Sequence, residues 1–323
     1  NESACISDSI THDNVAPSFT SLALSNEAAD GYISAADHAL SNDLASTLTA
    51  SGHSSAAYLL IADSTSCAIA AGSFSASMPQ TDSAVFTDEA DYRVCVMLED
   101  AAGNIAFGES AIIAFDETAP SDHSVSIDEG SITNSATINL TLAATGSSEM
   151  YITNTAGCGS GGTWESYATS KSSWTHGVSN ATANVYVKFK DAAGNESSCV
   201  SDSIIHDDTA PTGLSISIDE GDTTNSDTIN LTLAATDASE MYISNTAACA
   251  SDGTWESYAT SKASWTHGVS NGTATVYVKF KDAVGNESAC ISDSITHDNV
   301  APSITELIDQ LTNESYAYDA TTS

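Results

Sequence analysis

Acidic side chains recur in two short motifs of this sequence, and their types and spacing suit the binding of a divalent cation. One motif is the pentapeptide DAAGN or DAVGN, which begins at Asp100, Asp191 and Asp282. The other lies just before an Ala-Pro pair, in DETAP and HDDTAP, and supplies Asp116, Glu117, Asp207 and Asp208. Carboxylates that converge without a nearby lysine repel one another unless a cation lies among them. Calcium is the ion that such a cluster favours, because it accepts about six to eight oxygen ligands in irregular geometry.

The candidate calcium ligands form three groups, at the linkers that end at Pro17, Pro120 and Pro211, which we call the first, middle and last linker. At the last linker we expect the ligand set Asp128, Glu129, Asp207, Asp208, Asp237, Glu240 and Asp282. The equivalent set is Asp116, Glu117 and Asp191 at the middle linker, and Asp13 with Asp100 at the first. The first linker has Asn14 where the last has Asp208, a change that keeps an oxygen and removes a charge. A second interpretation stays open, since Asp and Asn also favour solvated turns for local reasons.

A tandem repeat positions these motifs. The segment TWESYATSKSSWTHGVSN begins at Thr163 and returns with one change at Thr254, an offset of 91 residues (254 − 163). Such periodicity indicates an array of similar units, so we predict repeat domains at 121–211 and 212–302. A divergent domain at 18–120 keeps only EDAAGN and FDETAP. Because the opening string NESACISDSITHDNVAPS returns at Asn286, residues 1–17 fit the last strand and linker of a preceding repeat, and 303–323 the start of a following one.

Each unit is predicted to be all-β. In the 121–211 repeat, NVYVKFK alternates apolar and polar residues from Asn184, so Val185, Val187 and Phe189 should face inward. About six or seven short strands per unit, separated by turn signals, are typical of an immunoglobulin-like or fibronectin III-like β-sandwich. With an odd number of strands, the two ends of a sandwich lie at opposite poles, so we expect the tandem domains to form a rod. The loop between the last two strands then returns to the N-terminal pole, next to the preceding linker.

The repeat also resembles a known family. Its segments MYITN, TWESYATSK, SWTH, VYVKFKDAAGNES and DSIIHDDTAP are similar to the bacterial immunoglobulin-like repeats of very large surface proteins and adhesins. The similarity covers most of both 91-residue units, whereas the 18–120 domain matches only through DAAGN and DETAP. The resemblance implies an extracellular stalk or adhesion role. It names no ligand, because members of the family differ in what they bind.

The seven cysteines follow the repeat register, and we predict one disulfide per domain. The predicted pairs are Cys67–Cys95, Cys158–Cys199 and Cys249–Cys290. Cys5 corresponds to Cys290, so its expected partner lies upstream of residue 1. Each disulfide would stabilise its domain by about 4 kcal/mol in the chain-entropy model. Regular pairs of this kind indicate an oxidising compartment, and we therefore expect a secreted or cell-surface location.

The charge balance excludes several classes of partner. The chain has 43 acidic and 7 basic residues, for a formal net charge of −36. Nucleic acids and anionic lipid surfaces both require a Lys/Arg footprint, so we expect neither as a partner. No segment reaches the ~18 apolar residues of a membrane span, so no direct membrane contact is expected in this segment. Self-repulsion of this size calls for screening by salt or bound cations.

The sequence favours a structural role over an enzymatic one, since it contains no HExxH, nucleophile elbow or Gly-rich phosphate loop. We predict an extender segment of a giant extracellular adhesin or surface fibre, with Ca2+ at the domain junctions and neighbouring repeats as its partners. One alternative is the subunit of an extracellular filament. Another is an array that binds a cell-surface glycan or protein, with the 18–120 domain as the binder. That domain lacks the paired tryptophans of the repeats, which we expect to pack in the cores; these are Trp164, Trp174, Trp255 and Trp265.

Overall fold

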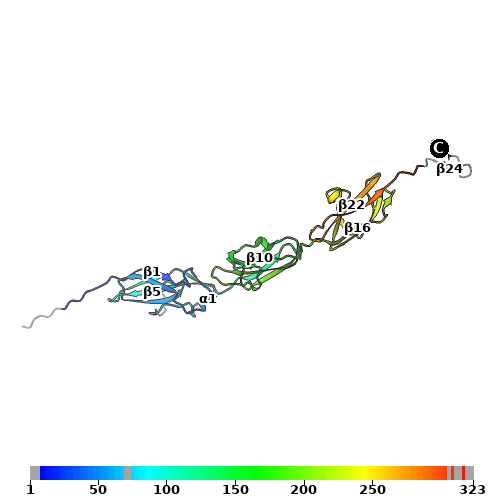
Figure 1. Cartoon of the computed structure of the whole chain (residues 1–323). Helices are drawn as coiled ribbons and strands as arrows, with labels where there is room; N and C mark the ends of the chain where they lie inside the picture. The colour runs from blue at the N-terminus through cyan, green and yellow to red at the C-terminus, as the bar shows by residue number, and fades with distance from the viewer. Residues whose placement is uncertain (1–7, 69–73, 304–306, 309–314, 317–323) are drawn as a thin grey trace, which may run out of the picture. The chain divides into compact units, whose positions relative to one another are not determined.

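The computed structural model describes residues 8–68 and 74–303, together with the short strands β24 (Leu307–Ile308) and β25 (Ser315–Tyr316) (Figure 1). Cys5 lies outside the described residues, as does most of 303–323. Residues 8–17, which fall in the predicted last strand and linker of a preceding repeat, are described and form no strand. The chain divides into two compact units. The first unit holds residues 1–131, 136–177 and 182–204, and the second holds 132–135, 178–181 and 205–323. The domain boundaries drawn from the repeat register remain a prediction.

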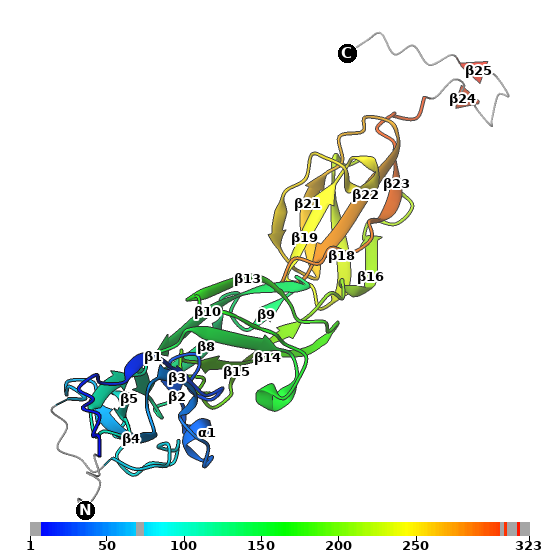
Figure 2. The same ribbon diagram turned by 90° about the vertical axis from the view of Figure 1, so that its left-hand side faces the viewer.

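Residues 121–206 form a three-stranded sheet in the order β13–β10–β8 and a five-stranded sheet in the order β12–β11–β14–β15–β9 (Figure 2). The two-residue strand β9 pairs parallel with β15, the last strand. The bounds are β8 (Ser121–Ile127), β9 (Ile132–Thr133), β10 (Thr137–Thr145), β11 (Glu149–Thr153), β12 (Trp164–Ser166), β13 (Ser170–Thr175), β14 (Ala181–Lys190) and β15 (Val200–His206).

Residues 212–297 repeat this topology, with sheets β16–β18–β21 and β17–β23–β22–β19–β20. The bounds are β16 (Thr212–Ile218), β17 (Thr223–Thr224), β18 (Thr228–Thr236), β19 (Glu240–Ser244), β20 (Trp255–Ser257), β21 (Ser261–Thr266), β22 (Gly272–Lys281) and β23 (Ile291–His297). One hydrophobic core contains apolar side chains from both sheets, including Leu231 of β18 and Phe280 of β22. The unit is therefore a β-sandwich, as the strand pattern predicts.

Residues 18–115 keep the larger sheet and reduce the smaller one. The larger sheet runs β2–β7–β5–β4 with β6 added to β5, and β2 pairs parallel with β7 as β9 does with β15. The smaller sheet contains β1 and β3. The bounds are β1 (Ser18–Leu24), β2 (Tyr32–Ile33), α1 (Ala35–His38), β3 (Ala45–Ser51), β4 (Ser55–Ala62), β5 (Ala90–Glu99), β6 (Ile105–Glu109) and β7 (Ile113–Phe115). This segment is thus a variant of the same sandwich.

Side-chain alternation accounts for the cores. Val185, Val187 and Phe189 of β14 are fully buried, as predicted, while Lys188 and Lys190, which alternate with them, lie on the outer face. Burial of apolar surface contributes about 25 cal/mol per Å2 to folding, and it fixes the strand register because a one-residue slip would expose this whole row. The alternation read from the sequence therefore positions the five-stranded sheet.

All three predicted disulfides are present. Their Cα–Cα distances are 5.5, 5.9 and 6.0 Å for Cys67–Cys95, Cys158–Cys199 and Cys249–Cys290. In both repeats the bridge joins the 3-10 turn after β11 or β19 to the segment that precedes the last strand, β15 or β23. No helix in the described part of the chain has the length and apolarity that crossing a bilayer requires.

Candidate functional site: the acidic linker loops

Each DAAGN-type loop closes on its own aspartate. The Oδ1 atom of Asp282 accepts backbone N–H groups from Val284, Gly285 and Asn286 at 2.8–2.9 Å, and its Oδ2 atom accepts the side-chain amide of Asn286 at 2.7 Å. Gly285 adopts φ 100°, a backbone conformation that only glycine adopts without strain. Asp191 and Asp100 make the same pair of contacts with Asn195 and Asn104. The aspartate is buried in each case, and its carboxylate is solvated by its own loop.

The asparagine of each loop also binds the linker that precedes its domain. The side-chain amide of Asn286 donates to the carbonyl oxygen of Asp207 at 2.9 Å, within the second unit. Within the first unit, Asn195 donates to the carbonyl of Asp116 at 2.8 Å, and Asn104 to that of Asp13 at 3.2 Å. We call this three-fold recurring contact the linker latch. The strand count predicts that loop and linker meet. The contact is made by the asparagine, which recurs in every copy of the motif and is not among the predicted ligands.

The middle linker concentrates unneutralised charge around Asp116. Burial raises the pKa of Asp116, and the negative charges of Asp191 and Asp88 raise it further, against one stabilising hydrogen bond from the Thr118 backbone N–H. A raised carboxylate pKa means that the ionised form is disfavoured in its surroundings. Two of the predicted ligands, Asp116 and Asp191, therefore interact here as like charges.

Asp88 is a member of this site that sequence reasoning missed. Its Oδ1 atom accepts the backbone N–H of Glu117 at 2.7 Å, and its Oδ2 atom accepts the Thr118 hydroxyl at 2.5 Å. The Glu117 N–H is the main cause of a lowered Asp88 pKa. The predicted ligand Glu117 itself contacts His38 Nδ1 through Oε1 at 2.7 Å. No sequence signal marks Asp88, because the segment that precedes β5 shares no motif with the equivalent segment of the repeats, 154–180.

The remaining predicted ligands are held by polar neighbours in their own units. Asp208 accepts the Ser179 hydroxyl, which lowers its pKa, and Asp207 accepts the backbone N–H of Thr209. Glu240 pairs with Lys281, and Asp237 is exposed with φ 63° in the turn between β18 and β19. Asp128 and Glu129, which belong to the first unit, accept from Thr141 and Asn139. The Oε2 atom of Glu129, and that of its counterpart Glu220, is buried without a hydrogen-bond partner.

The structure contains no preformed metal centre within its described residues: no three or more His, Cys, Asp or Glu side chains converge closely enough to hold an ion. The basic side chains are also committed elsewhere. Each of the seven Lys and Arg residues pairs with a carboxylate, as in Lys188–Glu196 at 2.6 Å and Lys279–Glu287 at 2.7 Å, and the predicted ligand among these partners is Glu240. The charge of the linker carboxylates is therefore balanced by solvent ions or by an added cation.

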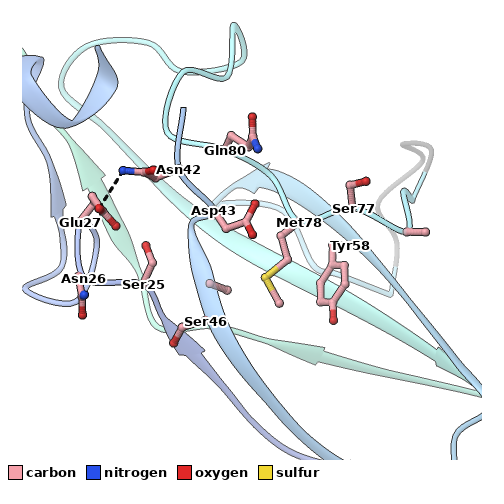
Figure 3. Close-up of a pocket in the computed structure, with 12 residues that line it drawn as sticks. Ser25, Asn26, Glu27, Asn42, Asp43, Ser46, Tyr58, Ser77, Met78 and Gln80 are labelled. Carbon is pink, nitrogen blue, oxygen red and sulfur yellow. Dashed lines mark hydrogen bonds between the residues drawn. The ribbon is translucent and has the colours of Figure 1, made fainter. Parts of the chain in front are cut away.

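A second candidate site is a polar groove of about 760 Å3 in residues 25–80 (Figure 3). Its walls are the turn after β1, the segment that leads into β3, and residues 76–80, and Tyr58 of β4 also lines it. The side chains of Glu27 and Asn42 are joined by a 2.9 Å hydrogen bond between Asn42 Nδ2 and Glu27 Oε1. In the repeats the connection between the equivalent strands, 154–180 or 245–271, has a different sequence and forms β12 and β13 or β20 and β21, whereas residues 63–89 supply one of these walls.

The repeat tryptophans divide between two environments, so the expectation that all of them pack in the cores is only half right. Trp265 packs against the core of residues 218–295. Trp255 instead lies on the outer face, with its ring 5.5 Å from that of Tyr242 and the Lys281 ammonium 4.4 Å from its centroid. Trp164 has the same neighbours in the preceding repeat, Tyr151 and Lys190. The ring of each outer-face tryptophan packs against the ammonium group of a lysine that also pairs with a glutamate, Lys190 with Glu149 and Lys281 with Glu240.

The comparisons with known proteins return structural neighbours and no family. No model of a protein family matches the chain, and no curated protein matches it either. A solved structure from a 1.5-MDa bacterial ice-binding adhesin is 16% identical, covers 88% of this chain and 98% of its own, and has a TM-score of 0.40. A Ca2+-stabilised adhesin of an Antarctic bacterium is 16% identical over 88% of this chain and 74% of its own, with a TM-score of 0.42. Fibronectin III-like modules of Clostridium thermocellum CbhA are 16% identical over 54% of this chain and 94% of their own, with a TM-score of 0.29. The chain is thus similar in outline to tandem immunoglobulin-like and fibronectin III-like repeats, adhesin repeats among them, and a likeness at these scores carries no argument about function.

Proposed function

We propose that this chain is an extender segment of a large extracellular adhesin or surface fibre, and that Ca2+ bound at the linkers stiffens it. The observation that carries the proposal is the linker latch, in which Asn104, Asn195 and Asn286 each bind the preceding linker. A contact that recurs once per unit serves the array rather than a single active site. The role is mechanical and not enzymatic.

Calcium is the cation of the proposal because carboxylate and carbonyl oxygens, the ligands that calcium takes, recur at each linker. At the middle linker these are Asp116, Asp191 and Asp88, with backbone carbonyls beside them. The mutual repulsion of these carboxylates is the energy that an added cation would relieve. Extracellular modules bind calcium with dissociation constants of about 10⁻⁴ to 10⁻³ M, which matches a site completed by the ion rather than preformed.

An extracellular location follows from the same proposal. Three disulfides form within single sandwiches, and such bonds persist where the compartment is oxidising. The neighbouring repeats of the same chain or fibre are the partners of an extender, and self-association of the purified chain would favour the filament alternative instead.

Small-angle X-ray scattering on the full chain tests the stiffening. We expect one narrow distribution of interatomic distances at about 5 mM Ca2+ and a broader one in excess EGTA, since about 5 mM exceeds the dissociation constants of such sites. Mg2+ at the same concentration should have less effect, because it demands near-octahedral geometry and releases water reluctantly. The matched variant is Asp116→Asn/Asp207→Asn, which removes the linker carboxylate at two equivalent positions and should scatter alike in both buffers. Identical wild-type profiles with and without Ca2+ would overturn the calcium proposal.

A further inference from the structure

The two backbone groups of Asp116, the first aspartate of the middle linker, are hydrogen-bonded to two different sandwiches. Its N–H donates to the carbonyl of Ile33 in β2 at 3.0 Å, and its carbonyl accepts the side-chain amide of Asn195 at 2.8 Å. Ile33 belongs to the sandwich before the linker, and Asn195 belongs to the sandwich after it. A continuous path of hydrogen bonds therefore runs from one sandwich to the next through a single linker residue.

The last linker repeats this arrangement. Asp207 N–H donates to the Thr133 carbonyl of β9 at 2.9 Å, and the Asp207 carbonyl accepts the Asn286 amide at 2.9 Å. After the next sandwich, Asp298 N–H donates to the Thr224 carbonyl of β17, again at 2.9 Å. Each parallel two-residue strand thus presents a carbonyl group to the linker that leaves its own sandwich.

The side chain of Asn195 also contacts the preceding sandwich directly. Its Nδ2 group donates to Asp191 Oδ2 at 3.0 Å and to the Asp116 carbonyl. Because a carboxylate and a carbonyl only accept, this orientation of the amide is fixed, and its Oδ1 atom accepts the Ala35 N–H at 2.9 Å. Ala35 is the first residue of α1, which begins one residue after β2. Asn195 is only 7% exposed, so water competes little for these bonds.

The last linker has a counterpart of this contact. Asn134 directly follows β9, as Ser34 directly follows β2, and the Nδ2 group of Asn134 donates to Asn286 Oδ1 at 3.3 Å. The donor at the middle linker is a backbone N–H whose direction is set by the Ser34 capping box of α1. The donor at the last linker is an exposed side chain. In both cases the segment after the parallel strand binds the Oδ1 atom of the next latch asparagine.

We propose that these contacts form an interdomain bridge, which holds neighbouring sandwiches together without a metal ion. Four residues make up each bridge: Ile33, Ala35, Asp116 and Asn195 at the middle linker, and Thr133, Asn134, Asp207 and Asn286 at the last. The inference deepens the proposed extender function and rests on it, but it does not depend on calcium. It also gives the two-residue parallel strands a role, which is to connect the linker to the sandwich before it.

Double electron–electron resonance on the full chain, in EGTA, measures the two bridges separately. Genetically encoded amino acids carry the spin labels, so the disulfides stay intact. One label pair is Thr49 with Ser126, across the middle linker, and the other is Ser126 with its repeat equivalent Ser217, across the last linker; all three side chains are exposed. We expect narrow distance distributions for both pairs in EGTA. Broad distributions that become narrow only with Ca2+ would overturn the bridge and leave the calcium proposal standing, whereas narrow ones that Ca2+ does not change would support the bridge and contradict calcium.

Ala35→Pro disrupts the middle bridge alone. Proline is tolerated at the first helical position, and Ser34 has the extended backbone (φ −82°, ψ 174°) that a residue before proline adopts. The substitution removes the N–H that Asn195 accepts and puts a ring carbon in the place of its hydrogen, so the two groups must separate. The Thr49–Ser126 distribution should broaden, and the Ser126–Ser217 distribution should stay as in wild type. A folded variant with an unchanged Thr49–Ser126 distribution would contradict the assignment.

Asn134→Ala is the matched variant for the last bridge. Because Asn134 is exposed, its truncation should leave the melting temperature as in wild type. The effects on the two label pairs should be reversed, with a broader Ser126–Ser217 distribution and an unchanged Thr49–Ser126 distribution. If neither distribution changed in Asn134→Ala, this side chain would not be part of the bridge. Broadening of both distributions would show a general loss of order and would also overturn the assignment.

Discussion

At the residue scale, three carboxylates at or near the linkers differ in how their surroundings affect ionisation. Asp100 and Asp88 have lowered pKa values, because hydrogen-bond donors (the Asn104 amide and the Glu117 N–H, respectively) stabilise their ionised forms. Asp116 has a raised pKa, because burial and the neighbouring carboxylates Asp191 and Asp88 oppose its ionisation. A bound cation would therefore relieve the most electrostatic repulsion at Asp116.

Asp116→Asn should raise the melting temperature in EGTA at pH 7. It should also abolish the further rise in melting temperature that Ca2+ bound at the middle linker would cause. In wild type without Ca2+, the raised folded pKa means that stability is lost as the pH rises from the unfolded value of 3.8 through the folded value. In the variant, stability should not fall over this pH range, because asparagine does not ionise. Thermal melts of both proteins across pH 3 to 7 would measure the difference. When the free Ca2+ concentration is about 10 to 100 times the dissociation constant of one site, binding there adds about 1.4 to 2.7 kcal/mol to the free energy of unfolding.

The control for this prediction is Asp122→Asn, an exposed aspartate of β8 outside the linker loops. It should leave both the pH profile and the Ca2+ response as they are in wild type. If Ca2+ raised the melting temperature of Asp116→Asn as much as that of wild type, this carboxylate would not be a ligand.

At the element scale, the 3-10 turns that carry the disulfide cysteines differ between the repeats in one telling position. Gly157 has φ 73° and a Cβ there would meet no atom within 4 Å, whereas the equivalent Ala248 has φ 59°. The left-handed conformation is unfavourable for alanine by about 1 kcal/mol, and open space around the site means that no steric clash adds to it. The same turn is thus relaxed in one repeat and strained in the other.

Reciprocal substitution measures that strain. Ala248→Gly should stabilise the 212–302 repeat by about 1 kcal/mol, and Gly157→Ala should destabilise the 121–211 repeat by about the same amount. Chemical denaturation of the full chain, followed by hydrogen exchange at β22 and β14, resolves the two repeats. Effects of the same sign in both variants would contradict the backbone explanation.

Strands with a strong alternating pattern could be predicted from the sequence. Strands that form only by pairing with a distant strand could not. The alternation in β14 fixed which residues face the core, and the cysteine register gave all three bridges. The two-residue strands β2, β9 and β17 carry no pattern of their own, because each exists only through pairing with a distant last strand. The groove was equally unreadable, since Ser25, Asn42 and Gln80 come from three separate segments.

At the whole-molecule scale, the net charge of −36 sets the background against which any calcium effect is measured. Each of the seven basic residues is ion-paired, so the remaining carboxylates are screened by mobile ions alone. The Debye length falls from about 30 Å at 0.01 M salt to about 3 Å at 1 M. Stability should therefore rise with ionic strength through a general effect that needs no binding site.

Adding Ca2+ at high NaCl concentration distinguishes this general screening from specific binding. NaCl should raise the melting temperature of wild type and of Asp116→Asn/Asp207→Asn alike, and the gain should level off near 1 M, where screening is complete. Millimolar Ca2+ added at that plateau should raise the melting temperature of wild type by a further few degrees. A stability change of about 1 kcal/mol shifts the melting temperature of a unit of about 150–250 residues, such as the first compact unit, by about 2–4 °C. The double variant should show no further rise. If Ca2+ added at the plateau changes neither protein, the acidic linkers act only as surface charge, and the latch asparagines Asn104, Asn195 and Asn286 hold loop to linker without an ion.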